Sequence, residues 1–399
     1  MNLHFNKMNC IVFFTNTYYL DDILPLIFEL KKANLISSVV FITTKEKWFY
    51  YIKQNVVLHD GIKSLGGKLT YLSKYKNRYL NILYNIFLLR KLFYSKVLTI
   101  IGTNGIQEGS MLISKTLLFN QKYWNGKMVL SKIRNWPNDF GYLEYKRSLR
   151  GRKESKGEIT KGYDAILYTK YPDEYWQELH AKLITDAKII QVGNSRVMKE
   201  WTRFINSNIK KYISREVTTP YFFFPLSVTG VWMSGERCPT GREKLVKCLK
   251  VFKEYNNEIL TVFKPHHKTD VNEFNEILET VNYTNYVISY LHPVMLIKNA
   301  KFTFVCSPSS LVWEACYNGC TTVEYADYDE RADQALKGET LHTGCVDYFI
   351  NRDVDKLEKI AEMLISNNEE AKRIHKRHEE KIPMPNVQEI IMNFRNLVL

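Results

Sequence analysis

Residues 259–267 read ILTVFKPHH and carry the pattern from which the fold can be argued. Residues 259–263 form a short apolar run without the polar alternation of a half-exposed strand, and an amphipathic helical pattern precedes them at 241–255. A run of this kind is typical of a parallel strand that is covered on both faces. The polar residues 264–267 would then follow the carboxyl end of the strand, where open parallel sheets bind their ligands.

The same alternation of short apolar strands and helices recurs along both halves of the chain. It predicts two Rossmann-like, doubly wound parallel-sheet domains of the α/β class. The expected strands are 10–15, 39–43, 68–72, 97–101 and 165–169 in the first half, and 221–226, 259–263, 286–289, 302–306 and 321–325 in the second. The expected helices include 21–33, 81–93, 241–255, 310–317, 354–366 and 387–399.

The length of 399 residues also favours two domains, because it exceeds what one compact core usually holds. The polar, basic stretch 206–220 shows little periodicity and is the expected junction. We therefore expect domains at 1–210 and 211–385, with a terminal helix at 386–399 that packs back on the first domain. The charge run at 146–161 is either a surface loop or a binding loop.

Composition restricts the class of protein. The chain is 45% hydrophobic and 25% charged, as in globular proteins, and its formal net charge of +14 favours anionic partners. No RNA-binding signature occurs and the basic residues are scattered, so nucleic acid is not the expected partner. The amino terminus reads as a strand rather than a signal peptide, and no apolar stretch reaches about 18 residues.

The seven cysteines include no CxxC pair, which fits reduced thiols in the cytoplasm. Cys316 and Cys320 with distant histidines are conceivable zinc ligands, but a CxxxC inside an apolar segment is typical of core packing.

The KPHH segment is the first candidate site. Pro265 fixes its own φ and biases Lys264 toward an extended conformation, so the following side chains leave the end of the strand. Lys264, His266 and His267 can bind phosphate oxygens, and a histidine can donate a proton to a leaving phosphate. The alternative is a polar turn. Joint metal ligation is awkward, since adjacent residues of an extended chain point to opposite sides.

The segment CSPSSLVWEACYNG, residues 306–319, is the second candidate. Ser307, Ser309 and Ser310 stand where a helix begins, and the free N–H groups of a helix start can bind a phosphate. Glu314 lies four residues after Ser310, on the same helix face, and suits the hydroxyls of a ribose. The alternative is a plainly capped helix with one exposed glutamate.

Three further positions are weaker candidates. Glu324, at the end of the strand after this helix, and His292, in YLHP, could contact a base or sugar or could cap loops. Glu108, in the glycine-rich loop GTNGIQEGS, is the carboxylate best placed to act as a general base. Asp60 and Asp139 are alternatives to it. The loop is neither GxGxxG nor a Walker loop, so a dinucleotide fold and an ATPase are not supported.

Taken together, these motifs resemble those of GT-B type glycosyltransferases of bacterial surface polysaccharides, chiefly the CMP-sugar-dependent sialyltransferases, polysialyltransferases and Kdo transferases. Those families carry an acidic motif that ends in glycine, an HP motif often within KPHP, and a serine pair. Lys264, Pro265 and His266 match, whereas His267 replaces a proline. Ser309 and Ser310 match the serine pair, and Gln107-Glu108-Gly109 matches the acidic motif in its last two positions.

The resemblance implies two domains that face each other across a cleft, an acceptor-binding first domain and a nucleotide-sugar-binding second domain. Glu108 would be the base, His266 the phosphate ligand or acid, and Ser309 and Ser310 phosphate ligands. The other residues argued above from their positions would complete the nucleotide site: Lys264, His267, His292, Ser307, Glu314 and Glu324. It implies transfer of an acidic sugar from a CMP-activated donor to a glycan hydroxyl, with no cofactor or metal. An acidic base in the first half suits inversion.

Two alternatives remain. CDP-glycerol-dependent polymerases of teichoic acid also resemble the chain, and a non-catalytic binder of polyanions would explain its charge. Helix 81–96 interleaves aromatic and basic residues, which suits peripheral contact with the anionic inner face of the cytoplasmic membrane, where a glycolipid or oligosaccharide acceptor would lie. The alternative for its apolar part is a buried helix of the domain.

Overall fold

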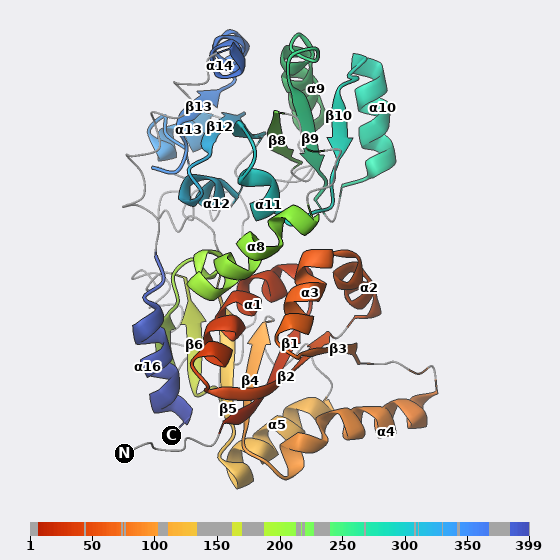
Figure 1. The fold of residues 1–399 in the computed structure, drawn as a ribbon, viewed down its shortest axis with the longest axis vertical. Coiled ribbons are helices and arrows are strands. Elements are labelled where there is room, and N and C mark those ends of the chain that lie inside the picture. The colour runs from red at the N-terminus through yellow and green to blue at the C-terminus, as the bar shows by residue number, and fades with distance from the viewer. Residues whose placement is uncertain are drawn as a thin grey trace. The chain divides into compact units, whose positions relative to one another are not determined.

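The computed structural model describes residues 7–43, 45–72, 75, 77–102, 111–133, 162–169, 187–212, 217, 220–226, 240–266, 269–306, 309, 311–328, 330–340, 344–366 and 384–398. These residues form two compact units, each of which is described by itself (Figure 1). The first unit contains the described residues up to 207 together with 384–398, and the second contains those from 208 to 366. Helix α8 (Lys199–Tyr212) begins in the first unit and ends in the second.

The first unit is built on a seven-stranded parallel sheet of order β3-β2-β1-β4-β5-β6-β7. Its strands are β1 (Met8–Phe14), β2 (Ile36–Thr43), β3 (Lys68–Tyr71), β4 (Val97–Gly102), β5 (Lys127–Lys132), β6 (Ala165–Tyr168) and β7 (Lys188–Gln191). The chain winds outward from β1 in one direction and then from β4 in the other. This is the doubly wound order, which places a topological switch point between β1 and β4.

The helices of the first unit have local signals of their own. They are α1 (Thr17–Lys32), α2 (Glu46–Gln54), α3 (Val56–Ser64), α4 (Arg78–Leu89), α5 (Met111–Trp124), α16 (Val387–Val398) and the 3₁₀ turns η1 (Arg90–Phe93) and η3 (Ser195–Val197). The Asn16 side chain caps α1 by accepting a hydrogen bond from the Tyr19 N–H, 3.1 Å away. Helix α16 buries Ile390 and Phe394 and packs against α1 and β7.

The second unit is built on a six-stranded parallel sheet of order β10-β9-β8-β11-β12-β13. Its strands are β8 (Tyr221–Pro225), β9 (Leu260–Lys264), β10 (Tyr286–Ile288), β11 (Phe302–Val305), β12 (Thr321–Ala326) and β13 (Tyr348–Asn351). Its helices are α9 (Thr240–Lys253), α10 (Val271–Val281), α11 (Pro293–Ile297), α12 (Leu311–Tyr317), α13 (Glu330–Leu336) and α14 (Val354–Ser366). The switch point of this sheet lies between β8 and β11.

Alternating residues of β8 fill two separate cores. Phe222 and Phe224 pack on the side of α9, α10 and α14, whereas Tyr221 and Phe223 pack on the side of α11 and α12. The first core is rich in aromatic rings, and the rings of Phe222 and Phe302 stack at 4.9 Å between centroids. Both faces of the sheet are therefore covered, which explains why its strands read as continuous apolar runs.

The predicted fold class is confirmed, since both sheets are parallel and doubly wound. The differences are local. The elements that were not anticipated are strands β5, β7 and β13 and helices α2, α3, α5, α8, α10 and α13, and α1 begins at Thr17 rather than near residue 21. The expected junction at 206–220 is helical as far as Tyr212, because α8 is an amphipathic helix that buries Trp201 and Ile205.

Helix α4 corrects one interpretation of the sequence. The apolar part of 81–96 was compatible with a buried domain helix, yet Leu83 is 62% exposed and Phe87 is 58% exposed. The described α4 side chains at 79–88 are exposed or half-buried, and the side chain of Leu89 is buried. In the described part of the chain, no helix combines the length and apolar character needed to cross a bilayer.

Candidate functional site

The carboxyl edge of the second sheet carries several of the polar residues that the sequence singled out. Because the strands are parallel, the residues that follow β9, β10, β11 and β12 lie along one edge. Lys264 ends β9, His292 follows β10, and Ser309 follows β11. The structure thus brings residues from three separate segments to the same edge of one sheet.

The KPHH segment forms a tight turn at the end of β9. Lys264 is the last residue of the strand rather than the first residue after it, and its carbonyl accepts a hydrogen bond from the Leu226 N–H at 2.9 Å. The His266 N–H donates to Thr269 Oγ1 at 3.0 Å, and the Thr269 N–H donates to the His266 carbonyl at 2.8 Å. The backbone of His266 is held by this turn, and its side chain is half-buried. His267 lies outside the described residues.

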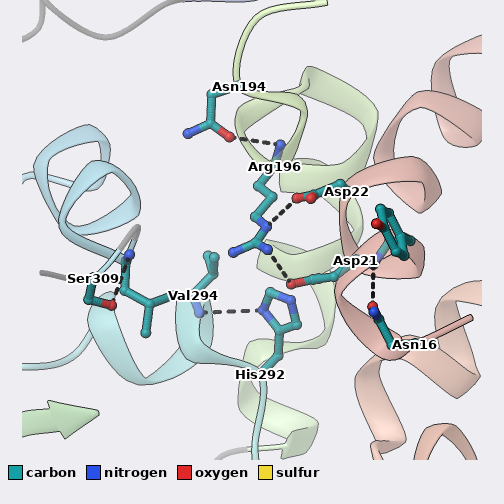
Figure 2. A network of polar contacts seen from close by, with 10 residues as sticks. Asn16, Asp21, Asp22, Asn194, Arg196, His292, Val294 and Ser309 are labelled. Atoms are coloured by element: carbon teal, nitrogen blue, oxygen red, sulfur yellow. Dashed lines mark hydrogen bonds and ion pairs between the residues drawn. The ribbon is translucent and has the colours of Figure 1, made fainter. Parts of the chain in front are cut away.

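His292 is fully buried and caps α11. Its Nδ1 accepts a hydrogen bond from the Val294 N–H at 3.4 Å (Figure 2). Its carbonyl accepts one from the Met295 N–H at 3.0 Å. Pro293 at the first helical position has no N–H to satisfy and fixes the entry to the helix. Since Nδ1 accepts, the proton of a neutral ring is on Nε2, which can donate. The structure therefore gives His292 the loop-capping role that the sequence left open.

Ser309 and Glu314 belong to the segment that follows β11. Ser309 Oγ accepts a hydrogen bond from the Leu311 N–H at 3.4 Å, and the Ser309 carbonyl accepts one from the Val312 N–H at 3.2 Å. Helix α12 begins at Leu311, one residue later than expected. Glu314 lies in its first turn, but its side chain is buried rather than exposed. Ser307 and Ser310 lie outside the described residues.

Glu324 lies inside β12, two residues before its end, and is completely buried. Its Oε1 accepts a hydrogen bond from the Tyr328 hydroxyl at 3.1 Å, and its Oε2 accepts one from Thr340. Burial raises the pKa of Glu324 from 4.5 to about 7, against the opposing effects of these two hydrogen bonds and of the positive charge of Lys244. The sequence placed it at the end of the strand, facing a ligand, whereas the structure places it beneath Tyr328 and Thr340.

The candidates for the catalytic base are resolved only in part. Glu108 and Asp139 lie outside the described residues. Asp60 lies within α3. Asp60 therefore stays an alternative to Glu108 for the base.

The first unit contains a buried ionic cluster that sequence reasoning missed. Arg196 is 5% exposed, and its guanidinium lies 3.0 Å from Asp22 Oδ1 and 3.2 Å from Asp21 Oδ2 (Figure 2). Both carboxylates come from α1, and Arg196 comes from η3 after β7. The signal was GNSR at 193–196, a polar turn directly after an apolar strand, which is the rule that singled out KPHH.

Asn194 belongs to this cluster through its side-chain oxygen. Asn194 Oδ1 accepts from the Arg196 N–H at 3.2 Å, whereas the buried Nδ2 has no hydrogen-bond partner in the described part of the chain. Elsewhere, the described residues contain no group of three His, Cys, Asp or Glu side chains that could hold a metal ion. Cys320, considered above as a zinc ligand, is buried with its Sγ 3.3 Å from Thr303 Oγ1.

A comparison with protein-family models gives no match, and neither does a sequence comparison with curated proteins. Solved structures match along almost the whole chain. The UDP-GlcNAc 2-epimerase of Neisseria meningitidis bound to UDP-GlcNAc has a TM-score of 0.53 at 14% identity, covering 98% of this chain and 100% of that one.

Two other structures match in the same way. Anabaena Alr3699/HepE in complex with UDP-glucose has a TM-score of 0.53 at 9% identity and covers 97% of this chain and 98% of its own. A mutant of S. aureus TarM in complex with Fondaparinux, alpha-GlcNAc-glycerol and UDP has a TM-score of 0.52 at 9% identity, with 98% and 100% coverage. At these identities the likeness establishes the fold, and the two doubly wound units are of the GT-B type.

Proposed function

We propose that the chain is a glycosyltransferase that takes its sugar from a nucleotide donor. The observation that carries the proposal is the set of polar residues at the carboxyl ends of three strands of the second sheet, at the edge where open α/β sheets bind ligands: Lys264 and His266, then His292, then Ser309. An epimerase bound to UDP-GlcNAc and a protein in complex with UDP-glucose share this fold.

The finer proposal concerns the donor. The KPH segment and the serine pair favour a CMP-activated acidic sugar of the sialic acid or Kdo type, transferred to a glycan hydroxyl of a surface polysaccharide. The three solved structures compared above contain UDP or a UDP-sugar, so a uridine donor is the direct competitor. The proposed partners are the donor, an oligosaccharide or glycolipid acceptor, and the anionic inner face of the cytoplasmic membrane.

The proposed reaction needs a base, an acceptor and a stabilised leaving group. Glu108 takes the proton of the acceptor hydroxyl, and the acceptor oxygen bonds to the anomeric carbon of the donor sugar. The bond between that carbon and the phosphate oxygen breaks, and its electron pair leaves with CMP. Lys264, His266 and the serines stabilise the charge that develops on the departing phosphate, and His266 can supply a proton to it. The proposal requires no cofactor or metal.

Thermal denaturation with CMP, CDP, UDP and GDP tests the donor. A stabilising shift with CMP supports the proposal if the affinity derived from it falls at least about tenfold in Lys264→Ala. The control is Lys247→Ala, at an exposed position of α9, which should keep the affinity of the wild type. A response to UDP alone contradicts the cytidine assignment. A response to no nucleotide, combined with strongly salt-dependent polyanion binding, favours the non-catalytic alternative.

Product analysis separates the remaining reactions. A CMP-sugar with a glycan acceptor should give a new glycosidic bond and free CMP. Transfer of glycerol phosphate from CDP-glycerol would instead form a phosphodiester, as in the polymerases that the motifs also resemble. Conversion of UDP-GlcNAc without an acceptor would indicate an epimerase, the activity named for the N. meningitidis protein of this fold.

A further inference from the structure

Helix α4 presents apolar side chains to solvent over most of its length. Six of them are at least 39% exposed: Tyr79, Leu80, Ile82, Leu83, Ile86 and Phe87. Exposed apolar residues are ordinary when scattered, but a contiguous group on one short helix marks an interaction surface. A helix that is apolar all round is normally buried in a core or in a membrane.

The exposure belongs to an ordered, anchored helix. Asn77 caps its start by accepting hydrogen bonds from the Tyr79 and Leu80 N–H groups at 2.9 and 3.2 Å. The Tyr84 hydroxyl is hydrogen-bonded to Thr70 of β3, and Leu89 at the far end is buried in the core of the unit. The helix is therefore held to the sheet on one side while its other side chains remain available.

The apolar surface continues onto α5. Phe93 of η1 contacts Phe119 with ring centroids 5.8 Å apart, and Phe119 contacts Tyr123 at 4.7 Å. Leu118, Tyr123 and Trp124 are exposed as well. Figure 1 shows α4 and α5 next to each other in the first unit. We refer to the six α4 residues together with Phe93, Leu118, Phe119, Tyr123 and Trp124 as the α4–α5 face.

The two segments that carry this face are basic, and the one carboxylate described beside α5 is Asp164, which accepts from Gln121 Nε2 and pairs with Lys127. Residues 73–102 and 111–127 contain nine lysines and arginines and no aspartate or glutamate. Arg90 places its guanidinium carbon 4.0 Å from the centre of the Phe87 ring, and Lys122 places its Nζ 5.2 Å from the centre of the Tyr123 ring. Cationic groups thus lie directly on exposed aromatic rings, an arrangement suited to the headgroup region of a bilayer.

We infer that the α4–α5 face binds the surface of a bilayer that contains anionic phospholipid. The apolar side chains enter the boundary between headgroups and acyl chains, and the basic residues contact the lipid phosphates. At 12 residues α4 is about 18 Å long, too short to span, so it lies in the plane of the membrane. A second copy of the chain fits less well, because two faces with this excess of positive charge repel each other.

The inference deepens the membrane contact of the proposed function by assigning the surface, and it does not depend on which donor is used. Cosedimentation of the full chain with vesicles tests it. Vesicles of phosphatidylcholine mixed with phosphatidylglycerol should bind the protein at about 0.15 M salt, and vesicles of phosphatidylcholine alone should bind it more weakly. No nucleotide is present, so failure here leaves the proposed transfer reaction standing.

Two pairs of variants locate the surface. Leu83→Ser with Phe87→Ser should weaken vesicle binding at least about tenfold, whereas Met384→Ser with Met392→Ser, also exposed apolar residues, should not. Arg90→Gln, Lys115→Gln and Lys122→Gln together should weaken binding to anionic vesicles about a hundredfold. The control removes the same number of positive charges from exposed positions elsewhere: Lys210→Gln, Lys247→Gln and Lys250→Gln. Its binding to anionic vesicles should weaken much less.

Because all these side chains are exposed, each variant should keep the melting temperature of the wild type. Absence of binding to anionic vesicles by the wild type overturns the inference, and so do equal losses in the variants and their controls. Self-association that disappears in Leu83→Ser with Phe87→Ser, without vesicle binding, would assign the face to a second copy instead. Binding to an acidic protein but to no vesicle would also overturn it.

Discussion

The Tyr328 hydroxyl donates a hydrogen bond to Glu324 Oε1 at 3.1 Å, and both side chains are buried. Together with Thr340, Tyr328 solvates a carboxyl group that has no contact with water. These two hydrogen bonds stabilise the ionised form, but burial outweighs them and sets the pKa at about 7. Glu324 therefore changes charge close to neutral pH.

We predict that Glu324 makes stability depend on pH. Because its pKa is higher in the folded chain than the ordinary 4.5, its contribution is complete below about pH 4.5 and is lost as the pH rises through about 7. A tenfold change in proton affinity is worth about 1.4 kcal/mol, so the loss amounts to about 3 kcal/mol, most of it between pH 5 and 8. Urea unfolding of the wild type and of Glu324→Gln over this range measures it.

The variant Glu324→Gln should show a correspondingly flatter pH profile. The control is Glu358→Gln on α14, where the side chain is exposed. It should keep the pH dependence of the wild type. Superimposable profiles for the wild type and Glu324→Gln would contradict the assignment.

The Arg196 cluster gives a second prediction. Arg196→Met leaves two carboxylates of α1 without their guanidinium, one of them fully buried, and should destabilise the chain by about 3–5 kcal/mol. Arg196→Lys should lose less stability, because it retains the positive charge. It should still lose some, because the ammonium group cannot bridge both carboxylates. Unfolding in urea measures both. Arg203→Met, which removes an exposed partner of Glu200, should cost no more than about 1 kcal/mol. Equal losses in Arg196→Met and Arg203→Met would contradict the structural role.

The strands of both sheets were predictable where both faces are covered, as in β8 and β9, because burial makes the whole segment apolar. Strand β5 was not recognised, since lysines stand at both ends of KMVLSK. The GNSR turn could have been singled out, but the pairing of Arg196 with α1 could not, since it joins residues 174 positions apart through the packing of η3 on α1.

Other features of the candidate site depended on tertiary packing in the same way. Placement of Lys264, His292 and Ser309 at one edge followed from the parallel direction of the strands and was predictable. The burial of Glu314 and Glu324 was not, because nothing in the sequence shows which side chains later segments cover. The exposure of α4 could not be inferred either, since an apolar helix looks the same whether a core or a membrane surrounds it.

His292 allows capping and ligand binding to be separated. His292→Ala removes the cap on α11 and should lower stability by about 1 kcal/mol, whereas His292→Asn can still accept from the Val294 N–H and should restore most of it. If the imidazole also binds the donor, both variants should reduce the thermal shift with CMP. A reduction in His292→Ala alone would restrict the residue to its capping role.

A substitution at Gly126 tests how α5, which carries part of the α4–α5 face, is held to the rest of the first unit. Asn120 Nδ2 donates hydrogen bonds to the carbonyls of Leu92 and Ser95 at 2.6 and 2.7 Å, which ties α5 to η1 and to the chain that follows it. A Cβ on Gly126 would overlap Asn120 Oδ1, so Gly126→Ala should displace the buried amide and cost about 1–3 kcal/mol in urea unfolding.

A double-mutant cycle makes this prediction specific. In the Asn120→Ala background the obstructing amide is absent, so adding Gly126→Ala should cost much less than it does in the wild type, with an interaction energy of about 1 kcal/mol or more. Additive losses would show that Gly126 is required for another reason, such as its approach to the Val97 carbonyl. Because Leu92 and Phe93 belong to the same turn, the loosened variant should also bind anionic vesicles more weakly at temperatures below its unfolding transition.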